Sequence, residues 1–280
     1  LGPDGRHVRV AIIHLGCHDR QAVHGYRADI LDRRDFLDLL LDGARDKRLD
    51  TLRRQARKSR DDLGVAALGF GAAPDGTSFY GISIENGRIR PDVRKGIRAA
   101  VTTLGLGVRM TPHQDVVLTG VRDRAELLAI LDAHGVARSE AVSRVRSLGI
   151  ACPAKPTCGL AMTDAENILP HYFDALEAAG LGDIDLEIRM TGCPNNCARP
   201  PTAEIGIFGY GKNDHVILAG GSRCGTRLAS VLYERVSGEQ MVTALVGLFR
   251  AVKEHCPAGT PPGDWIAATD FKTLRRWIAL

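Results

Sequence analysis

The hydrophobic and polar positions of this chain follow two periods, and each period predicts one type of element. Alternation with a period of two predicts strands over residues 78–84, 108–111, 115–121, 184–190, 203–211 and 215–221. Helical spacing predicts helices over residues 91–105, 123–135, 138–149, 163–180, 225–236 and 271–280, with another helix beginning after Ser237. A short apolar run at 8–16 predicts one more strand. We therefore expect helices and strands to be mixed along the chain.

Local signals mark where several of these elements begin. Asp123 followed by Glu126, and Thr163 followed by Glu166, match the pattern of a helix N-terminus in which a side chain caps a free amide. Pro170 predicts a kink inside the second of these helices, because proline cannot donate the helical hydrogen bond. Other boundaries carry related signals, namely the Asn86-Gly87 turn, Pro91 at a helix start, and Ser237 with Gln240.

The order of the predicted elements divides the chain into three segments. Residues 64–135 run strand, helix, strand, strand, helix, which is typical of a small α+β sandwich of the ferredoxin-like kind. Residues 136–280 form a second, mixed domain. Residues 1–63 form a mostly helical N-terminal segment of unclear origin. Charges of both signs alternate over 33–60, which indicates a solvated helix face; the alternative is a docking face for an acidic electron donor.

Composition narrows the function classes. The chain has 280 residues, of which 44% are apolar and 25% are charged, so it is long enough to fold around a real core. It contains no apolar run long enough to span a bilayer and no secretory signal at its start, so we expect a cytoplasmic protein without a membrane partner. A net charge of +4 does not argue for nucleic acid. Since the first residue is Leu, we expect a fragment or partial chain.

Four cysteines form two short clusters with unusual spacing. Cys152 and Cys158 are separated by five residues, Cys193 and Cys197 by three, and 34 residues lie between the pairs. Zinc ribbons and bacterial ferredoxins both space their cysteines differently. Two loops from separate parts of one domain are therefore expected to meet at a metal. The other cysteines, which we interpret as free thiols of a reducing compartment, are Cys17, Cys224 and Cys256.

The residues around these cysteines resemble a known family. The strings ACPAKPTCGLAMTDAE and MTGCPNNCARPPTAEIGIFGYG are similar to the C-terminal half of the sirohaem and [4Fe-4S] sulfite and nitrite reductases. The segment LAGGSRCGTRL and the Ala-Arg-Pro after Cys197 resemble the assimilatory sulfite reductases more than the nitrite reductases. The resemblance covers 64–280. It implies an α+β fold in which a ferredoxin-like half-module is followed by an α/β domain that binds sirohaem and the iron–sulfur cluster.

The resemblance also implies cofactors and roles. It implies a [4Fe-4S] cluster on the four cysteines Cys152, Cys158, Cys193 and Cys197, and a sirohaem whose iron shares Cys197 as a bridging axial ligand. The implied reaction is the six-electron reduction of sulfite to sulfide. An anionic substrate and a carboxylate-rich macrocycle both need positive charge, so we predict roles for Arg199 and Lys155. Further basic candidates are Arg189, Arg223 and Arg227.

A second group of residues is predicted to contact the sirohaem. In the family, a turn corresponding to residues 107–121 approaches this cofactor, which by resemblance implies contacts from Arg109, Thr111 and Gln114. His113 and Asp115 stand where the family carries asparagine, so only Gln114 of this triplet is carried over. Asn195 and Asn196 are predicted to shape the second cysteine loop or to bind the cofactor.

Three alternatives stay open at this stage. A ferredoxin-dependent nitrite reductase would share most of these features. An iron–sulfur electron-transfer subunit without its own turnover is possible because the family's first half, which supplies much of the sulfite-gripping charge, is not visible here. A structural zinc site with four cysteines is the third. The expected electron donor is ferredoxin or a flavoprotein reductase, since no nicotinamide or flavin fingerprint is present.

Overall fold

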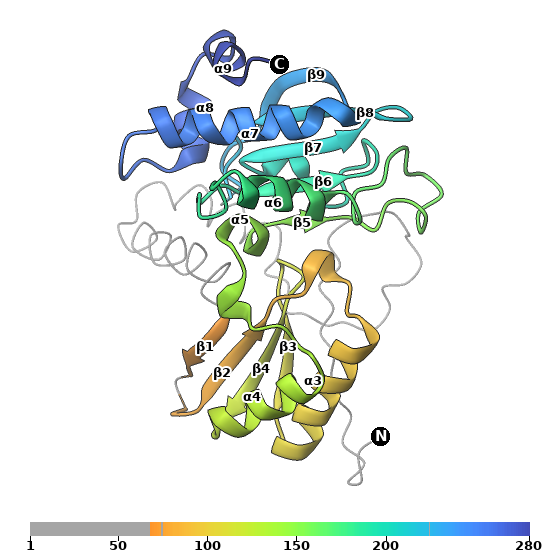
Figure 1. The fold of residues 1–280 in the computed structure, drawn as a ribbon, viewed down its shortest axis with the longest axis vertical. Helices are drawn as coiled ribbons and strands as arrows, with labels where there is room; N and C mark the ends of the chain where they lie inside the picture. Colours follow the sequence, from red (N-terminus) through yellow and green to blue (C-terminus); the bar gives the residue numbers. More distant parts are fainter. Residues whose placement is uncertain (1–67, 74, 224) are drawn as a thin grey trace, which may run out of the picture. The chain divides into compact units, whose positions relative to one another are not determined.

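The computed structural model describes residues 68–280, except for 74 and 224 (Figure 1). All of these residues belong to one unit of the chain, Arg54–Leu280. The predicted strand at 8–16, the charged helices over 33–60 and the thiols Cys17 and Cys224 lie outside the described residues. None of the described helices combines the length and the apolar character that a bilayer-spanning segment needs.

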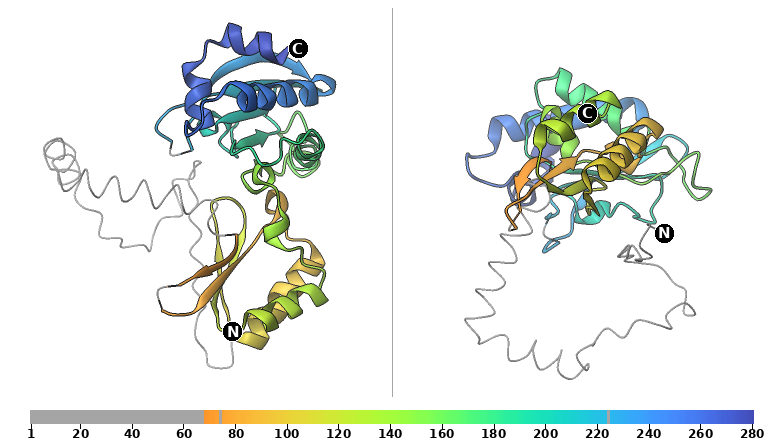
Figure 2. Two further views of the ribbon diagram at one scale, coloured as in Figure 1. Left: turned by 60° about the vertical axis from the view of Figure 1, so that its left-hand side comes forward. Right: turned by 90° about the horizontal axis from the view of Figure 1, so that it is seen from below.

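The first part is a four-stranded antiparallel sheet in the order β1-β2-β4-β3. Two helices cover one of its faces (Figure 2). The strands are β1 (Gly69–Ala72), β2 (Ser78–Ile82), β3 (Gly107–Met110) and β4 (Val116–Val121), and the helices are α3 (Pro91–Leu104) and α4 (Arg124–Ala133). Tyr80, Leu118 and Leu127 are fully buried between the sheet and the helices. The predicted order of elements is confirmed, with β1 as an addition that its glycine-rich sequence did not reveal.

Local signals in this half-module act as predicted. Asn86 and Gly87 have φ values of 51° and 71° in a short turn of 3-10 helix, Glu85–Gly87. The α3 helix ends at Gly105, whose φ of 65° is a left-handed conformation that glycine adopts easily. The carboxylate of Asp123 accepts a hydrogen bond from the amide of Glu126 at 2.9 Å, so the predicted cap of α4 is confirmed.

The second part is a five-stranded sheet in the order β5-β6-β7-β8-β9. Its strands are β5 (Ile150–Ala151), β6 (Ile188–Thr191), β7 (Ile205–Gly209), β8 (Asp214–Ala219) and β9 (Ser230–Ser237). The β5, β6 and β7 strands are parallel, and the other pairs are antiparallel. The helices are α6 (Leu169–Ala178), α7 (Gly238–His255), α8 (Pro262–Ala268) and α9 (Phe271–Ile278), and one apolar core joins them to the sheet.

Two predicted helices are shorter than expected. In place of a helix over 138–149, the chain forms a 3-10 turn (Ser139–Ala141) and a single helical turn, α5 (Arg144–Ser147). The predicted helix over 163–180 begins only at Leu169, so Thr163 does not cap it. Pro170 lies in the first turn of α6, where the missing amide has no intrahelical partner to lose. It therefore starts the helix and does not kink it.

The strands of this sheet also differ from the prediction. The predicted helix over 225–236 is wrong, because residues 230–237 pair with β8 as the edge strand β9. Leu232 and Val236 are buried, whereas Val231 is 44% exposed, so an apolar run compatible with either period is resolved by sheet pairing. The β6 strand covers only the end of the predicted strand over 184–190. All four of its residues are buried, as expected for a strand inside a sheet covered on both faces.

Candidate functional site

The sheet brings the two cysteine pairs to the same edge. Cys152 directly follows β5, and Cys193 comes two residues after the end of β6. Because β5 and β6 are parallel neighbours, their carboxyl ends lie at one edge of the sheet. The amide of Cys152 donates to the carbonyl of Met190 at 3.1 Å, which extends this pairing into the first loop.

Backbone hydrogen bonds join the two loops. The amide of Gly192 donates to the sulfur of Cys152 at 3.3 Å. The carbonyl of Gly192 accepts from the amides of Met162 and Thr163 at 2.7 and 3.0 Å. A side chain at Gly192 would not fit, since its Cβ would lie 2.5 Å from the carbonyl oxygen of Thr163 and 2.7 Å from the Cβ of Ala154. The two loops therefore lie in direct backbone contact.

The four thiols differ in exposure and influence one another. Cys152 and Cys193 are buried, Cys158 is half-buried and Cys197 is exposed. Burial raises the pKa of Cys152, and the nearby Cys197 and Cys193 raise it further, while the amides of Gly192 and Ala154 oppose the shift. Cysteines of the second loop thus lie close enough to act on the thiol of Cys152 in the first.

The donor set fits an iron–sulfur cluster. Among residues 68–280, apart from the two gaps, no three His, Cys, Asp or Glu side chains are grouped as the ligands of a single metal ion. A cube of four irons spaces its ligands more widely than one ion does. Thiolates are the ligands that such a cube requires, and amides directed at sulfur tune its potential. The amide of Gly192 already has this relation to Cys152.

The second cysteine loop carries an orphaned polar atom. Asn196 and Arg199 have positive φ values of 59° each, so the loop turns tightly around Cys197. The side-chain oxygen of Asn196 is buried and has no hydrogen-bond partner among the described residues. Asn195, in contrast, is exposed. Of the two predicted asparagines, Asn196 is thus the one with a buried side-chain oxygen that can still accept a hydrogen bond.

The half-module contributes one side chain to the cysteine loops. Gln114, with a φ of 70°, donates from Nε2 to the carbonyl of Ala151 at 3.0 Å, directly before Cys152. Its Oε1 is buried without a partner. The hydroxyl of Thr111 accepts from the amides of His113 and Asp115, which closes the turn over 111–115.

The predicted basic residues have different surroundings. Arg109 is exposed, and its side chain donates to the carbonyl of its neighbour Val108 at 2.9 Å. Lys155 is exposed and donates to the carbonyl of Met162 at 2.8 Å, within its own loop. Arg199 is exposed, yet the desolvation of its guanidinium and the charge of Arg189 lower its pKa. Two cations near each other favour an anion between them.

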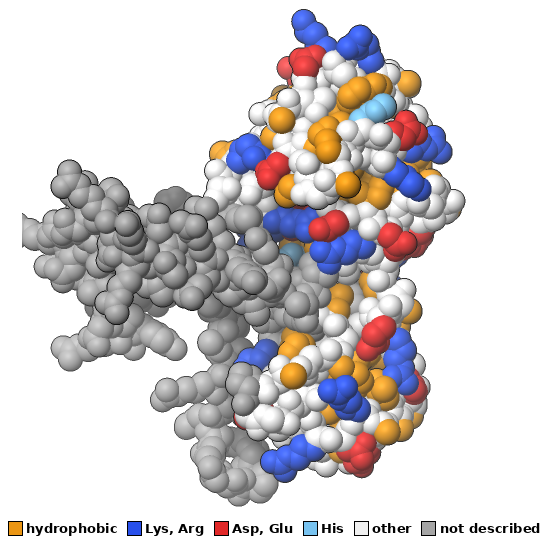
Figure 3. Space-filling view, turned by 90° about the vertical axis from the view of Figure 1, so that its left-hand side faces the viewer, with side chains coloured by type: hydrophobic (Ala, Val, Ile, Leu, Met, Phe, Trp, Pro, Cys, Tyr) orange, Lys and Arg blue, Asp and Glu red, His pale blue; other side chains and the backbone are white. Residues whose placement is uncertain are grey.

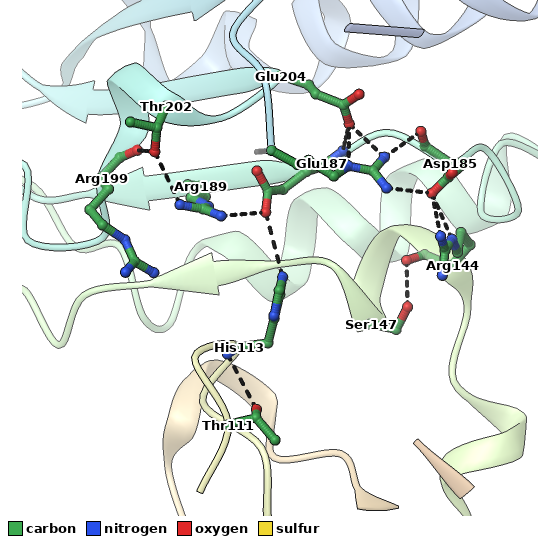
Figure 4. Close-up of polar contacts among 11 residues, drawn as sticks. Thr111, His113, Arg144, Ser147, Asp185, Glu187, Arg189, Arg199, Thr202 and Glu204 are labelled. Carbon is green, nitrogen blue, oxygen red and sulfur yellow. Dashed lines mark hydrogen bonds and ion pairs between the residues drawn. The ribbon is translucent and has the colours of Figure 1, made fainter. Parts of the chain in front are cut away.

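A buried polar network was not predicted from the sequence (Figure 4). Glu187 is completely buried and accepts from Arg189 at 2.7 Å, while Nε2 of His113 lies 3.6 Å from the same carboxylate oxygen. The amide of Glu187 donates to Glu204, which also binds Arg223 at 2.7 Å. The signal in the sequence is an acidic residue inside a predicted strand, and alternation alone does not show that Glu187 is buried.

The ionisation of the network follows from its ion pairs. Burial acts to raise the pKa of Glu187, but the polar contact with His113 and the charges of Arg189 and Arg223 outweigh it and hold this pKa below its usual value. Burial dominates at Glu204 and raises its pKa. Arg227 lies apart from the network, since it donates to the carbonyl of Gly220 and to Asp264.

Comparison with known proteins agrees with this geometry. Residues 72–134 match the nitrite/sulfite reductase ferredoxin-like half domain. The chain is 37% identical over 220 residues to a sulfite reductase [ferredoxin] of Synechococcus elongatus, which covers 75% of this chain and 35% of the relative. It is 33% identical over 201 residues to a sulfite reductase [NADPH] hemoprotein beta-component of Staphylococcus carnosus, covering 68% of this chain and 35% of the relative. The chain thus spans about a third of the length of these relatives.

Solved structures share the fold. The NirA protein of Mycobacterium tuberculosis superposes with a TM-score of 0.66 at 22% identity, over 74% of this chain and 41% of that protein. A dissimilatory sulfite reductase I structure superposes with a TM-score of 0.57 at 10% identity. At these identities the structures support the α+β fold alone. The half-domain match and the curated relatives show that the chain belongs to the nitrite and sulfite reductase family.

Proposed function

We propose that this chain is the cluster-carrying part of an assimilatory sulfite reductase, which reduces sulfite to sulfide with six electrons. The observation that carries the proposal is the backbone contact between the two cysteine loops, centred on Gly192 and the sulfur of Cys152. The names of the curated relatives support sulfite as the substrate. Because this chain spans only about a third of the length of those relatives, the complete enzyme is proposed to include residues beyond this family segment.

The residues that would hold the cofactors can be named. Cys152, Cys158, Cys193 and Cys197 would bind the [4Fe-4S] cluster, with Cys197 also bridging to the sirohaem iron. The orphaned oxygens of Gln114 and Asn196 are acceptors, so a water molecule would link them to the carboxylates of a cofactor edge, and we assign Arg109, Thr111 and Asn195 to the same edge. When bound, the two groups supply one-electron transfer and an iron at which the substrate anion is reduced.

Positive charge near the second loop would attract and orient the anion. Arg199 follows the bridging cysteine by two residues and feels the charge of Arg189. Lys155 lies in the first loop and holds that loop through the carbonyl of Met162. We therefore propose that Arg199 contacts the substrate or a cofactor carboxylate, and that Lys155 adds to the local positive potential.

The electron donor is proposed to be ferredoxin or a flavoprotein reductase, as the names of the relatives suggest for those proteins. Figure 3 shows charged side chains of both signs interspersed on the described part of one face, so that face does not select a donor by charge alone. A cytoplasmic location, and the absence of nucleic-acid and membrane partners, remain predictions from the sequence.

Two other functions are tested by the same assays. Nitrite reduction is favoured by the shared half domain, whose family includes both activities. Electron transfer without turnover is favoured by the length of the chain relative to its relatives. Reduction of sulfite, of nitrite or of neither by the purified protein, with a chemical electron donor, separates the three.

Replacing the proposed bridging ligand tests the assignment. In Cys197→Ser we expect sulfite turnover to fall at least about a hundredfold, because a hydroxyl is a poor substitute for a thiolate that joins two redox centres. Cys256→Ser is the matched control, since Cys256 is half-buried outside both loops and its thiol donates to the nearby carbonyls of Pro257 and Thr260. Full turnover by Cys197→Ser would contradict the bridging role.

A further inference from the structure

A continuous line of polar contacts connects the half-module turn to the loop after Cys197 (Figure 4). It begins with His113, whose Nε2 lies 3.6 Å from Glu187 Oε1. Arg189 donates to Glu187 from Nη2 at 2.7 Å and to Thr202 Oγ1 from Nη1 at 3.2 Å. The hydroxyl of Thr202 in turn donates to the carbonyl of Arg199 at 3.0 Å.

Because the charged residues in this line of contacts are buried, they lose free energy of hydration, and what the line contributes is its geometry. Glu187 is completely buried and Arg189 is only 7% exposed. An ion pair in such surroundings adds little net stability compared with apolar residues, because both charges lose their water. The ion pair instead fixes the orientation of its neighbours, because the planar guanidinium of Arg189 donates to two acceptors at once.

Thr202 is the link between this ion pair and the loop. Its hydroxyl accepts from Arg189 and donates to the carbonyl of Arg199, which uses both capacities of a hydroxyl. Arg199 itself has a φ of 59°, a left-handed conformation that is strained for a residue with a side chain. Two backbone hydrogen bonds, from Arg199 N to Asn196 O and from Thr202 N to Arg199 O, hold the turn as well.

We propose that Glu187, Arg189 and Thr202 are positioning residues that hold the loop over 197–202 in its left-handed conformation at Arg199, and that His113 ties this loop to the half-module. The consequence for catalysis rests on the proposed function, because it is Arg199 that this line would present to the anion. The loop geometry itself does not depend on that function.

Other charged groups around Glu187 are compatible with this role. Glu204 accepts from the amide of Glu187 and is paired with Arg223, which also pairs with Asp185. Glu204 is thus compensated by Arg223 and does not compete for Arg189. Arg189 is left to bridge Glu187 and Thr202.

Hydrogen exchange of the purified protein tests the proposal without any assay of activity. In Thr202→Val the hydroxyl is lost while the side-chain volume is kept, so we expect the amides of Arg199, Thr202 and Ala203 to exchange about tenfold faster. Thr202→Ser retains the hydroxyl and should restore slow exchange. Thr102→Val is the matched control, because Thr102 also donates its hydroxyl to backbone carbonyls, in α3, far along the chain.

A separate variant tests the proposed connection between the loop and the half-module through His113. His113→Asn should accelerate exchange at the same three amides several-fold, although position 113 is remote from them in sequence. Wild-type exchange in Thr202→Val, or equally fast exchange in Thr202→Ser, would overturn the positioning role; wild-type exchange in His113→Asn would overturn the tie. A protein that lacks sulfite turnover but shows these exchange changes would refute the proposed function and leave this inference standing.

Discussion

At the scale of single residues, the pKa values of two buried carboxylates of this chain are shifted in opposite directions. Glu187 has ion-pair partners that hold its pKa below the usual range. Asp115 is 6% exposed, and burial raises its pKa to about 6, although the amide of Ile84 and the charge of His113 oppose the shift. The amide of Ile84 donates to Asp115 at 2.9 Å, which fixes the turn to the end of β2.

The raised pKa of Asp115 predicts that Asp115→Asn increases the unfolding free energy in a pH-dependent way. The raised folded pKa of about 6 means that the protonated acid stabilises the fold, a contribution present below the unfolded pKa and lost as pH rises through the folded pKa. Asparagine does not ionise and can still accept from Ile84. Between pH 4 and pH 7 we expect the unfolding free energy of the variant to improve relative to wild type by up to about 2 kcal/mol. Urea unfolding at both pH values measures this.

A constant difference between the variant and wild type at the two pH values would contradict it. The result would then mean that folding does not shift the pKa of Asp115.

At the scale of elements, two glycines allow strand ends and the first cysteine loop to touch. A Cβ at Gly209, the end of β7, would lie 2.3 Å from Oγ1 of Thr163 and 2.6 Å from the carbonyl of Gly192. The corresponding distance at Gly192 is 2.5 Å to the carbonyl of Thr163. The residues before α6 therefore lie in close contact with the backbone at the ends of β6 and β7.

Gly192→Ala should separate the loops. The added methyl group has only backbone atoms and the small side chains of Ala154 and Ala161 around it, so we expect a loss of about 1–3 kcal/mol in unfolding free energy and a lower iron content. Gly159→Ala, in the first cysteine loop, is the matched control: its Cβ would meet nothing within 4 Å, and its expected change is under about 0.5 kcal/mol. Chemical unfolding and iron analysis measure both variants. Equal behaviour of the two would show that the loops are not in close contact.

Sequence reasoning succeeded where signals were local. The Asp123 cap, the Ser237 capping box and the left-handed Gly105 each depend on neighbouring residues, and each is present in the structure. The β9 strand was mistaken for a helix because its apolar positions suit either period and only pairing with β8 decides between them.

The site shows the same division. The cysteine pairs could be recognised by their spacing and their flanking residues. Glu187 and His113 could not, because they lie 74 residues apart in the sequence and their contact arises from the fold. Buried polar partners of this kind have no periodic signature along a chain.

At the scale of the whole molecule, ion pairs and hydrogen bonds connect the half-module to the larger sheet. Arg88 pairs with Glu166, and Arg146 pairs with Glu85 as well as with Asp174 and Glu177. Gln114 adds the contact to Ala151 beside the first cysteine. The half-module is thus connected to the larger sheet by several polar contacts, one of which lies directly before Cys152.

An absorption spectrum of protein purified without oxygen tests whether the two cysteine loops hold one iron–sulfur cube beside a sirohaem. We expect haem bands together with a broad iron–sulfur shoulder, both lost in Cys193→Ser and both kept in Cys256→Ser. A wild-type spectrum without either feature, from protein that contains zinc on the four cysteines, would show that no such cube is bound.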